Sequence, residues 1–152
     1  HGWQLRYGGT KLYSDHSNDG SGAAESLRLA TKELLKRIAQ IPAPSLLQRG
    51  PSANKKSNLP VGISGPIVRQ RRGSVLRDCS LAVLVPRFGE KPQRCSIYIG
   101  TENTYTVARF KAALKRAIEM RNEAVEAYEL ATTKDKRAQG RELKKQLKAA
   151  AG

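Results

Sequence analysis

The stretch "DCSLAVLVPRFGEKPQRCSIYIG", residues 78–100, decides the fold. Residues 78–85 alternate between two sets of side chains, and residues 94–100 do so again after the loop 86–93. Alternation with a period of two is typical of a half-buried strand, and a short loop containing Gly and Pro between two such runs is typical of a hairpin. The pattern predicts two antiparallel strands with an apolar inner face, made of Cys79, Leu81, Val83, Val85, Cys95, Ile97 and Ile99.

Segments on both sides of this hairpin extend it into a module. The stretch 61–72, "VGISGPIVRQRR", predicts a preceding strand, and Gly65-Pro66 would interrupt it. Downstream, Thr106 is placed to cap a helix over about 107–131, whose apolar residues recur at three and four. We therefore expect an α+β module in which one amphipathic helix covers one face of a three-stranded antiparallel sheet.

The N-terminal part of the chain repeats this order in a shorter form. Residues 2–15, "GWQLRYGGTKLYSD", predict a hairpin, and the stretch from Ala23 to about residue 39 predicts an amphipathic helix. No strand precedes this hairpin, so the first module is incomplete, and we expect either a missing upstream segment or another segment or subunit at that edge. The expected organisation is a module over 1–41, a proline-rich linker over 42–59, a module over 60–131 and a basic tail or frayed helix over 132–152.

Charge is the strongest functional indication. The net charge of the 152 residues is +15, and residues 42–77 hold seven basic residues and no acidic one. Such clustering is typical of proteins that bind nucleic acid through its phosphates. No stretch predicts a membrane span, and a cytoplasmic, nucleoid-associated protein is expected. Cys79 and Cys95 fit two core residues of a reduced protein rather than a metal site, so neither a metal nor a cofactor is expected.

The two modules resemble the DNA-binding domain of the Apetala and ethylene-response-factor type, in its bacterial and phage versions. Val61-Gly62-Ile63 resembles the Gly-Val segment of the family's first strand, Tyr98-Ile99-Gly100-Thr101 resembles the Gly-Thr segment after its third strand, and "VARFKAALKRAIEMRNEA" resembles its Ala-rich helix. "HGWQLRYGGTKLYSD" is similar to the phage-type hairpin, and together these matches cover about residues 2–41 and 60–130. The second module lacks the family's tryptophan in its middle strand, where Cys79 or Leu81 stands. The resemblance implies sequence-specific binding to duplex DNA, with the sheet in the major groove.

Residues on the uncovered faces of the two sheets are the candidate DNA contacts. Arg69 and Arg71 are expected to face outward, whereas Gln70 and Arg72 would do so if Gly65-Pro66 bulged the strand. Arginine on such a face can read guanine, small residues allow close approach, and basic residues at the margins can meet phosphates. The full candidate set is Arg69, Gln70, Arg71, Arg72, Arg77, Ser80, Arg87, Lys91, Arg94, Ser96 and Tyr98, with Gln4, Arg6, Lys11 and Tyr13 in the first module.

The sequence favours a bacterial or phage transcriptional regulator that is not an enzyme. It has only two histidines, and no Gly-rich phosphate loop is followed by lysine. Two alternatives stay open at this point: the DNA-gripping part of a mobile-element recombinase or homing endonuclease, and a basic RNA- or ribosome-associated protein. The expected partner is double-stranded DNA, a homo-oligomer is compatible with the sequence, and neither a membrane nor a small-molecule substrate is indicated.

Overall fold

The computed structural model describes residues 1–70 and 72–151. The fold is α+β, as predicted, with one two-stranded and one three-stranded antiparallel sheet. Contacts divide the chain into two compact units. Unit 1 comprises residues 1–45 and 129–152, and unit 2 comprises residues 46–128.

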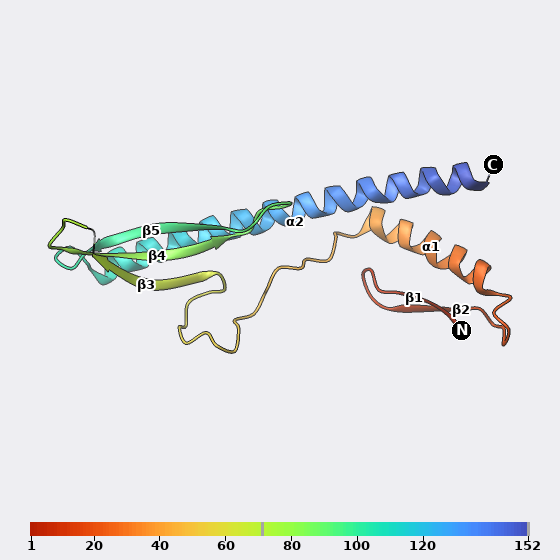
Figure 1. Ribbon diagram of the computed structural model, residues 1–152, viewed down its shortest axis with the longest axis horizontal. Helices are drawn as coiled ribbons and strands as arrows, with labels where there is room; N and C mark the ends of the chain where they lie inside the picture. The colour runs from red at the N-terminus through yellow and green to blue at the C-terminus, as the bar shows by residue number, and fades with distance from the viewer. Residues whose placement is uncertain (71, 152) are drawn as a thin grey trace. The chain divides into compact units, whose positions relative to one another are not determined.

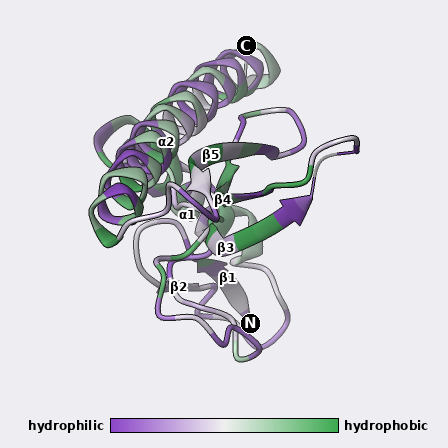
Figure 2. Ribbon diagram, turned by 90° about the vertical axis from the view of Figure 1, so that its left-hand side faces the viewer, coloured by the Kyte–Doolittle hydropathy of each residue, from purple (hydrophilic) through white to green (hydrophobic). Residues whose placement is uncertain are grey.

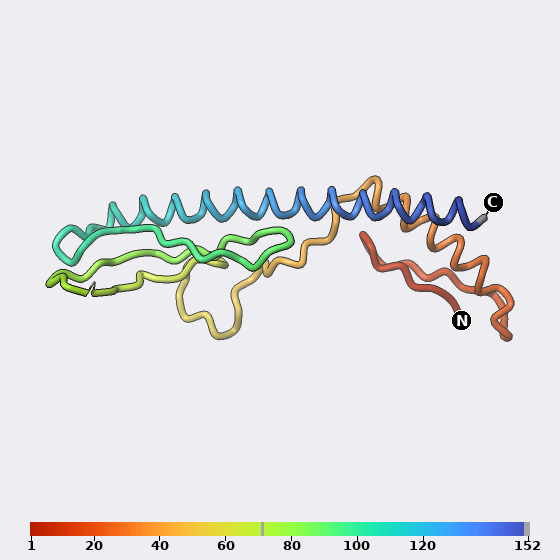
Figure 3. The backbone as a smooth tube through the Cα atoms, turned by 45° about the horizontal axis from the view of Figure 1, so that its top comes forward, coloured from red at the N-terminus to blue at the C-terminus, as the bar shows by residue number. Residues whose placement is uncertain are grey.

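Unit 2 contains a three-stranded sheet in the order β3-β4-β5. The strands are β3 (Ile63–Gln70), β4 (Arg77–Val85) and β5 (Gln93–Thr101). They run alongside the first half of helix α2 (Val107–Ala151), and both views of the chain show this arrangement (Figures 1 and 3). The predicted hairpin over 78–100 and its preceding strand are therefore confirmed.

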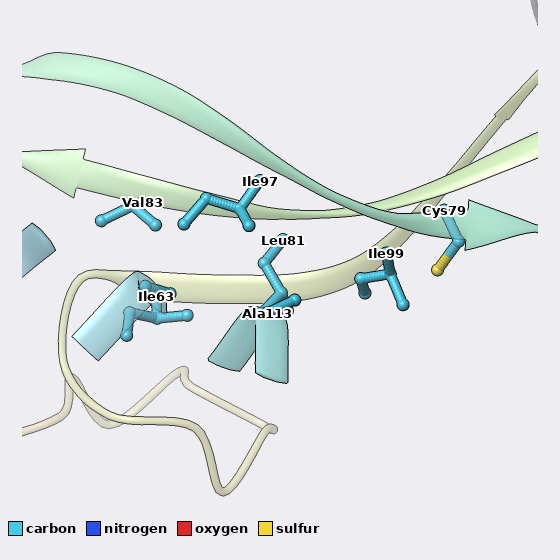
Figure 4. Packing of buried hydrophobic residues seen from close by; sticks show 8 residues of the cluster. Ile63, Cys79, Leu81, Val83, Ile97, Ile99 and Ala113 are labelled. Carbon is cyan, nitrogen blue, oxygen red and sulfur yellow. The ribbon is translucent and has the colours of Figure 1, made fainter. Parts of the chain in front are cut away.

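The core of unit 2 lies between this sheet and α2. Leu81, Val83 and Ile63 are almost completely buried, and they pack with small residues of α2. Figure 4 shows these side chains gathered around the α2 segment that carries Ala113. Ala113 and Ala117 are buried in this core, and Phe110, Leu114 and Ile118 of α2 pack against it while partly buried. Cys79 is buried here and Cys95 is partly buried, and both are free thiols.

Helix α2 begins where the sequence predicts and continues far beyond its predicted end. Arg109 N–H donates to Thr106 Oγ1 at 3.1 Å, so Thr106 is the expected N-cap. The helix does not end near residue 131 but runs through to Ala151. The stretch 132–152, expected as a mobile tail or frayed helix, is thus regular helix over its described residues and belongs to unit 1. The residues of this stretch favour helix. Its contacts with the rest of unit 1 are not visible in the local sequence.

Unit 1 contains the N-terminal hairpin, helix α1 (Ala23–Gln40) and the end of α2. Strands β1 (Gly2–Leu5) and β2 (Lys11–Ser14) pair with each other, and α1 contacts both. Trp3 Nε1–H donates to Ala23 O at 3.1 Å, and Arg37 Nη1 donates to Tyr7 O and Gly9 O, each at 2.9 Å. These bonds join both ends of α1 to the hairpin. The helix thereby supports a two-stranded sheet that would be marginally stable alone.

Candidate nucleic-acid interface

One face of the three-stranded sheet is turned away from the core of unit 2. Cross-strand partners lie on the same face of a sheet, and neighbours along a strand alternate. Leu81 and Val83 are buried against α2. Residues that alternate with them along β4, and the cross-strand partners of those residues, therefore lie on the opposite side of the sheet. We call this side the open face, and it comprises Ser64, Ile67, Arg69, Asp78, Ser80, Ala82, Leu84, Arg94, Ser96 and Tyr98.

The centre of the open face is made of small side chains. Ala82 lies in register between Ser64 of β3 and Ser96 of β5, and Ser80 lies opposite Tyr98. Tyr98 is 53% exposed, and Ser64 and Ser96 are exposed as well. Ala82 itself is only 6% exposed and Ser80 is half-buried, so the accessible part of this centre lies on the outer strands β3 and β5.

Arginines stand at both ends of the open face. Arg69 is in register with Asp78 at one end, and Arg94 is in register with Leu84 at the other. Both arginines are exposed. From Asp78 to Leu84 the strand advances six residues, which corresponds to about 20 Å at ~3.4 Å per residue.

A β-bulge decides which β3 side chains reach this face. Ser64 pairs with Ala82 and Ile67 pairs with Ser80, so Gly65 and Pro66 of β3 stand opposite Leu81 alone. The interruption expected at Gly65-Pro66 is therefore confirmed. The extra residue inverts the alternation, so that Ile63 points to the core but Ile67 and Arg69 belong to the open face. The C-terminal end of the β3 ribbon is hydrophilic in Figure 2, because the strand ends in Arg69 and Gln70.

The bulge is present but leaves Arg69 outward, so the expectation that a bulge would turn Gln70 outward instead is wrong. Gln70 is in register with Arg77 on the side of Cys79, and its Nε2 donates to Ser74 O at 3.2 Å. Arg72 is exposed in the turn that follows β3. Arg71 lies outside the described residues.

Arg77 is engaged in an ion pair at the end of β4. Its Nε and Nη2 lie 3.1 and 2.9 Å from Glu102 Oε2, and its backbone N–H donates to Glu102 Oε1 at 3.3 Å. The side-chain hydrogen bonds from Arg77 lower the pKa of the Glu102 carboxyl below its ordinary value. Arg77 is therefore held at the margin of the sheet and lies off the open face.

The loop between β4 and β5 carries two more candidate residues. Arg87 forms an ion pair with Glu90 within the loop, and Lys91 is exposed. Phe88 packs edge-to-face against Tyr128 of α2, with ring centroids 6.0 Å apart. This aromatic contact holds the loop against α2. Because the loop connects the strand ends that carry Leu84 and Arg94, Arg87 and Lys91 lie beyond the Arg94 end of the open face.

The hairpin of unit 1 places only part of its predicted set on one face. Trp3 pairs with Tyr13 and Leu5 with Lys11, whereas Gln4 pairs with Leu12. Lys11 and Tyr13 therefore share the face of Trp3 and Leu5, and their predicted place on one face with Gln4 and Arg6 is wrong, although Lys11 stays exposed and Tyr13 is half-buried. The register set by the five-residue connection 6–10 causes this, because a shift of one residue inverts every side chain.

Gln4 and Arg6 remain together on the other side of the hairpin. Arg6 Nε and Nη2 donate to Gln4 Oε1 at 2.9 and 2.6 Å, and both residues are exposed. Lys11 Nζ instead lies 5.0 Å from the ring centre of Tyr13, as a cation–π contact. The outward set of unit 1 is thus smaller than the sequence predicts.

Five residues of the open face were not in the candidate set: Ser64, Ile67, Asp78, Ala82 and Leu84. Ser64, Ile67 and Asp78 reach this face because the bulge fixes the pairing of β3 with β4. The Gly65-Pro66 dipeptide was the signal that could have found Ile67, but its effect on phase depends on the pairing itself. Asp78 places a carboxylate opposite Arg69, which combines a positive and a negative group at one end of the face.

The remaining observations bear on the class of protein. Within the described ranges, no three His, Cys, Asp or Glu residues are grouped closely enough to hold a metal ion. Of the helices that the structure describes, none combines the length and apolar character needed to span a membrane. Comparison with protein families, with curated proteins and with solved structures finds no match for this chain.

Proposed function

We propose that this protein binds double-stranded DNA sequence-specifically, with the open face of unit 2 in the major groove. The observation that carries the proposal is the composition of that face: small residues at its centre, exposed serines on the outer strands and an exposed arginine at each end. Arginine reads guanine O6 and N7 through two hydrogen bonds, and small residues remove the side-chain bulk that would hold the sheet away from the bases.

The dimensions of the sheet suit the groove. Neighbouring strands lie about 4.8 Å apart, so the outer strands β3 and β5 are separated by roughly 10 Å. The major groove of B-form DNA is about 12 Å wide and admits a small number of strands. A face about 20 Å long would cover about six base pairs at ~3.4 Å per pair.

Basic residues at the margins supply the phosphate contacts in this proposal. Arg72 follows β3, and Arg87 and Lys91 lie in the loop between β4 and β5. Such residues fix the position of a protein on the duplex without reading its sequence. The +15 net charge of the chain adds long-range attraction to the DNA polyanion.

The proposed biological role is that of a bacterial or phage transcriptional regulator of the Apetala and ethylene-response-factor type. Gln4 and Arg6 in unit 1 are the residues of a weaker second contact, and linking two weak binding modules raises the overall affinity for one duplex. The DNA-gripping part of a recombinase or homing endonuclease would use the same face.

RNA binding is less well supported by the arrangement of aromatic residues. Recognition of single-stranded RNA uses several aromatic side chains on an exposed sheet, on which bases stack. Of the two candidates, Tyr98 lies on the open face, whereas Tyr13 is half-buried on the hairpin face of Trp3 and Leu5. A single exposed aromatic residue on the open face favours reading of a DNA groove over stacking of RNA bases.

A charge-insertion experiment tests the proposed face directly. The double variant Ser80→Glu with Ser96→Glu adds two negative charges to the centre of the open face. Ala112→Glu with Ala127→Glu adds the same charge at exposed positions of α2 and serves as the matched control. In fluorescence anisotropy with labelled duplex DNA, we expect the first variant to lose at least about 100-fold in affinity and the control less than about fivefold.

Two outcomes would contradict the proposal. Equal losses in the two variants would mean that net charge alone governs binding. Preference of the wild-type protein for structured RNA over duplex DNA, in competition at one salt concentration, would support the RNA alternative.

A further inference from the structure

A groove in unit 1 has no role in the proposed DNA contact. It runs between α1 and the end of α2, and it consists of two adjoining pockets of about 630 and 720 Å³. Lys32, Leu35 and Lys144 line both pockets, so the two form one continuous depression. The groove follows α1 from Ala24 to Ala39, a distance of about 22 Å at ~1.5 Å per residue.

The two helices that form the groove are held together at one end. Gly140 is buried against Ile38, and a Cβ added at Gly140 would lie 2.9 Å from Ile38 Cγ2. Ala43 N–H also donates to Thr133 Oγ1 at 3.1 Å. From this closed end the helices diverge towards the N-terminus of α1 and the C-terminus of α2 (Figure 1).

The floor of the groove is apolar. It includes Leu27, Leu35 and Leu147, and the first and last of these are 42% and 44% exposed. The hairpin covers only part of the apolar stripe of α1, since the buried residues of that helix are Ser26, Ala30 and Ile38. A second apolar strip of α1 is therefore left to face the groove.

The rim of the groove is basic along both helices. The cations are spaced at three and four residues, which places them along one side of each helix. They are Arg28, Lys32 and Lys36 on α1, and Arg137, Arg141, Lys144 and Lys148 on α2; Arg28 is ion-paired with Glu25. None of the described residues that line either pocket is acidic.

We propose that this groove binds an acidic amphipathic helix of a partner protein. The apolar side of such a helix would cover the leucines of the floor, and its carboxylates would meet the basic rim on both sides. A groove about 22 Å long accommodates about four helical turns. A second copy of this chain suits it less, because both surfaces would be basic, and a phosphate backbone would leave the leucine floor without an apolar partner.

The test measures binding of a synthetic peptide to the full chain by fluorescence anisotropy. The probe is a labelled helix of roughly sixteen residues with Leu at positions three and four apart and Glu elsewhere. A scrambled peptide of the same composition keeps the charge but breaks the amphipathic pattern. We expect saturable binding of the amphipathic peptide and at least about tenfold weaker binding of the scrambled one.

Two groove variants locate the site. Lys32→Glu with Lys144→Glu reverses two positive charges of the rim. Leu27→Ser with Leu147→Ser removes apolar contacts of the floor at exposed positions without changing the charge. Each should weaken peptide binding at least about tenfold. Lys111→Glu with Lys115→Glu is the matched control, because it makes the same charge change at exposed positions of α2 in unit 2 and should alter binding less than about twofold.

Several results would overturn this assignment. They are absence of peptide binding, equal binding of the scrambled peptide, and equal losses in the groove and control variants. Loss of duplex DNA binding in the rim variant, with peptide binding unchanged, would assign the groove to phosphates instead. Far-UV circular dichroism confirms that each variant is folded, and the peptide assay needs no DNA, so its outcome is independent of the proposed DNA contact.

Discussion

Replacement of Arg69 by Ala is the most informative single change on the open face. Arg69 is exposed at one end of this face, in register with Asp78, and the β3 bulge places it there. A bidentate arginine–guanine contact contributes about 1–3 kcal/mol to discrimination between bases. Since ~1.4 kcal/mol corresponds to a factor of ten, Arg69→Ala should weaken binding to the preferred duplex about 5- to 150-fold.

The loss must depend on sequence if Arg69 reads a base. Arg116→Ala removes the same charge from an exposed position of α2 in the same unit and serves as the control. Affinities for the preferred duplex and for a scrambled duplex, measured by anisotropy at several salt concentrations, separate the two effects. A lost phosphate contact would weaken both duplexes alike and reduce the salt slope by about 0.9. Equal weakening of both duplexes by Arg69→Ala would refute the assignment of base reading to this residue.

Three further predictions concern the structure that positions the face. Leu81→Ala should destabilise the protein by about 2–5 kcal/mol in urea denaturation, because Leu81 is completely buried, whereas Leu84→Ala on the same strand should cost less than about 1 kcal/mol. Gly62→Ala should destabilise the protein by about 1–3 kcal/mol, because Gly62 has φ +78° and the Arg121 guanidinium occupies the space of a Cβ. Gly73→Ala is the control, because Gly73 has φ +80° but nothing near its Cβ position, and it should cost less. Equal costs would show that the clash with Arg121 contributes nothing. Arg77 lowers the pKa of Glu102 in the folded state, so the ion pair stabilises the protein at pH above the ordinary carboxyl pKa. The difference in unfolding free energy between wild type and Glu102→Gln should therefore shrink as pH falls through the lowered pKa of Glu102. A difference that does not change with pH would contradict this prediction.

The elements of unit 2 could be predicted because each of them carries a strong local pattern. The alternation over 78–100 and the cap at Thr106 are both found in the structure. The phase of β3 could not be predicted in the same way. Gly65-Pro66 signals an interruption, but only the pairing of Ser64 with Ala82 and of Ile67 with Ser80 shows where the extra residue falls.

Unit 1 shows two further limits of reading the sequence. The hairpin connection sets the register, so Lys11 and Tyr13 lie on the face of Trp3 and Leu5 although their spacing in the sequence resembles that of an outward set. The end of α2 has few large apolar residues, and it contacts parts of the chain distant in sequence, such as Ile38 opposite Gly140. Local propensity favours helix there, but the sequence alone does not show the distant contacts that this part of α2 makes.

Selection of bound sequences from a random duplex library tests the central claim most directly. The wild-type chain should enrich a motif of about six base pairs containing guanine, which matches the ~20 Å length of the open face. The Ser80→Glu with Ser96→Glu variant should enrich none, while the Ala112→Glu with Ala127→Glu control should enrich the same motif as wild type. Recovery of duplex without any enriched motif by the wild-type protein would contradict sequence-specific reading by this face.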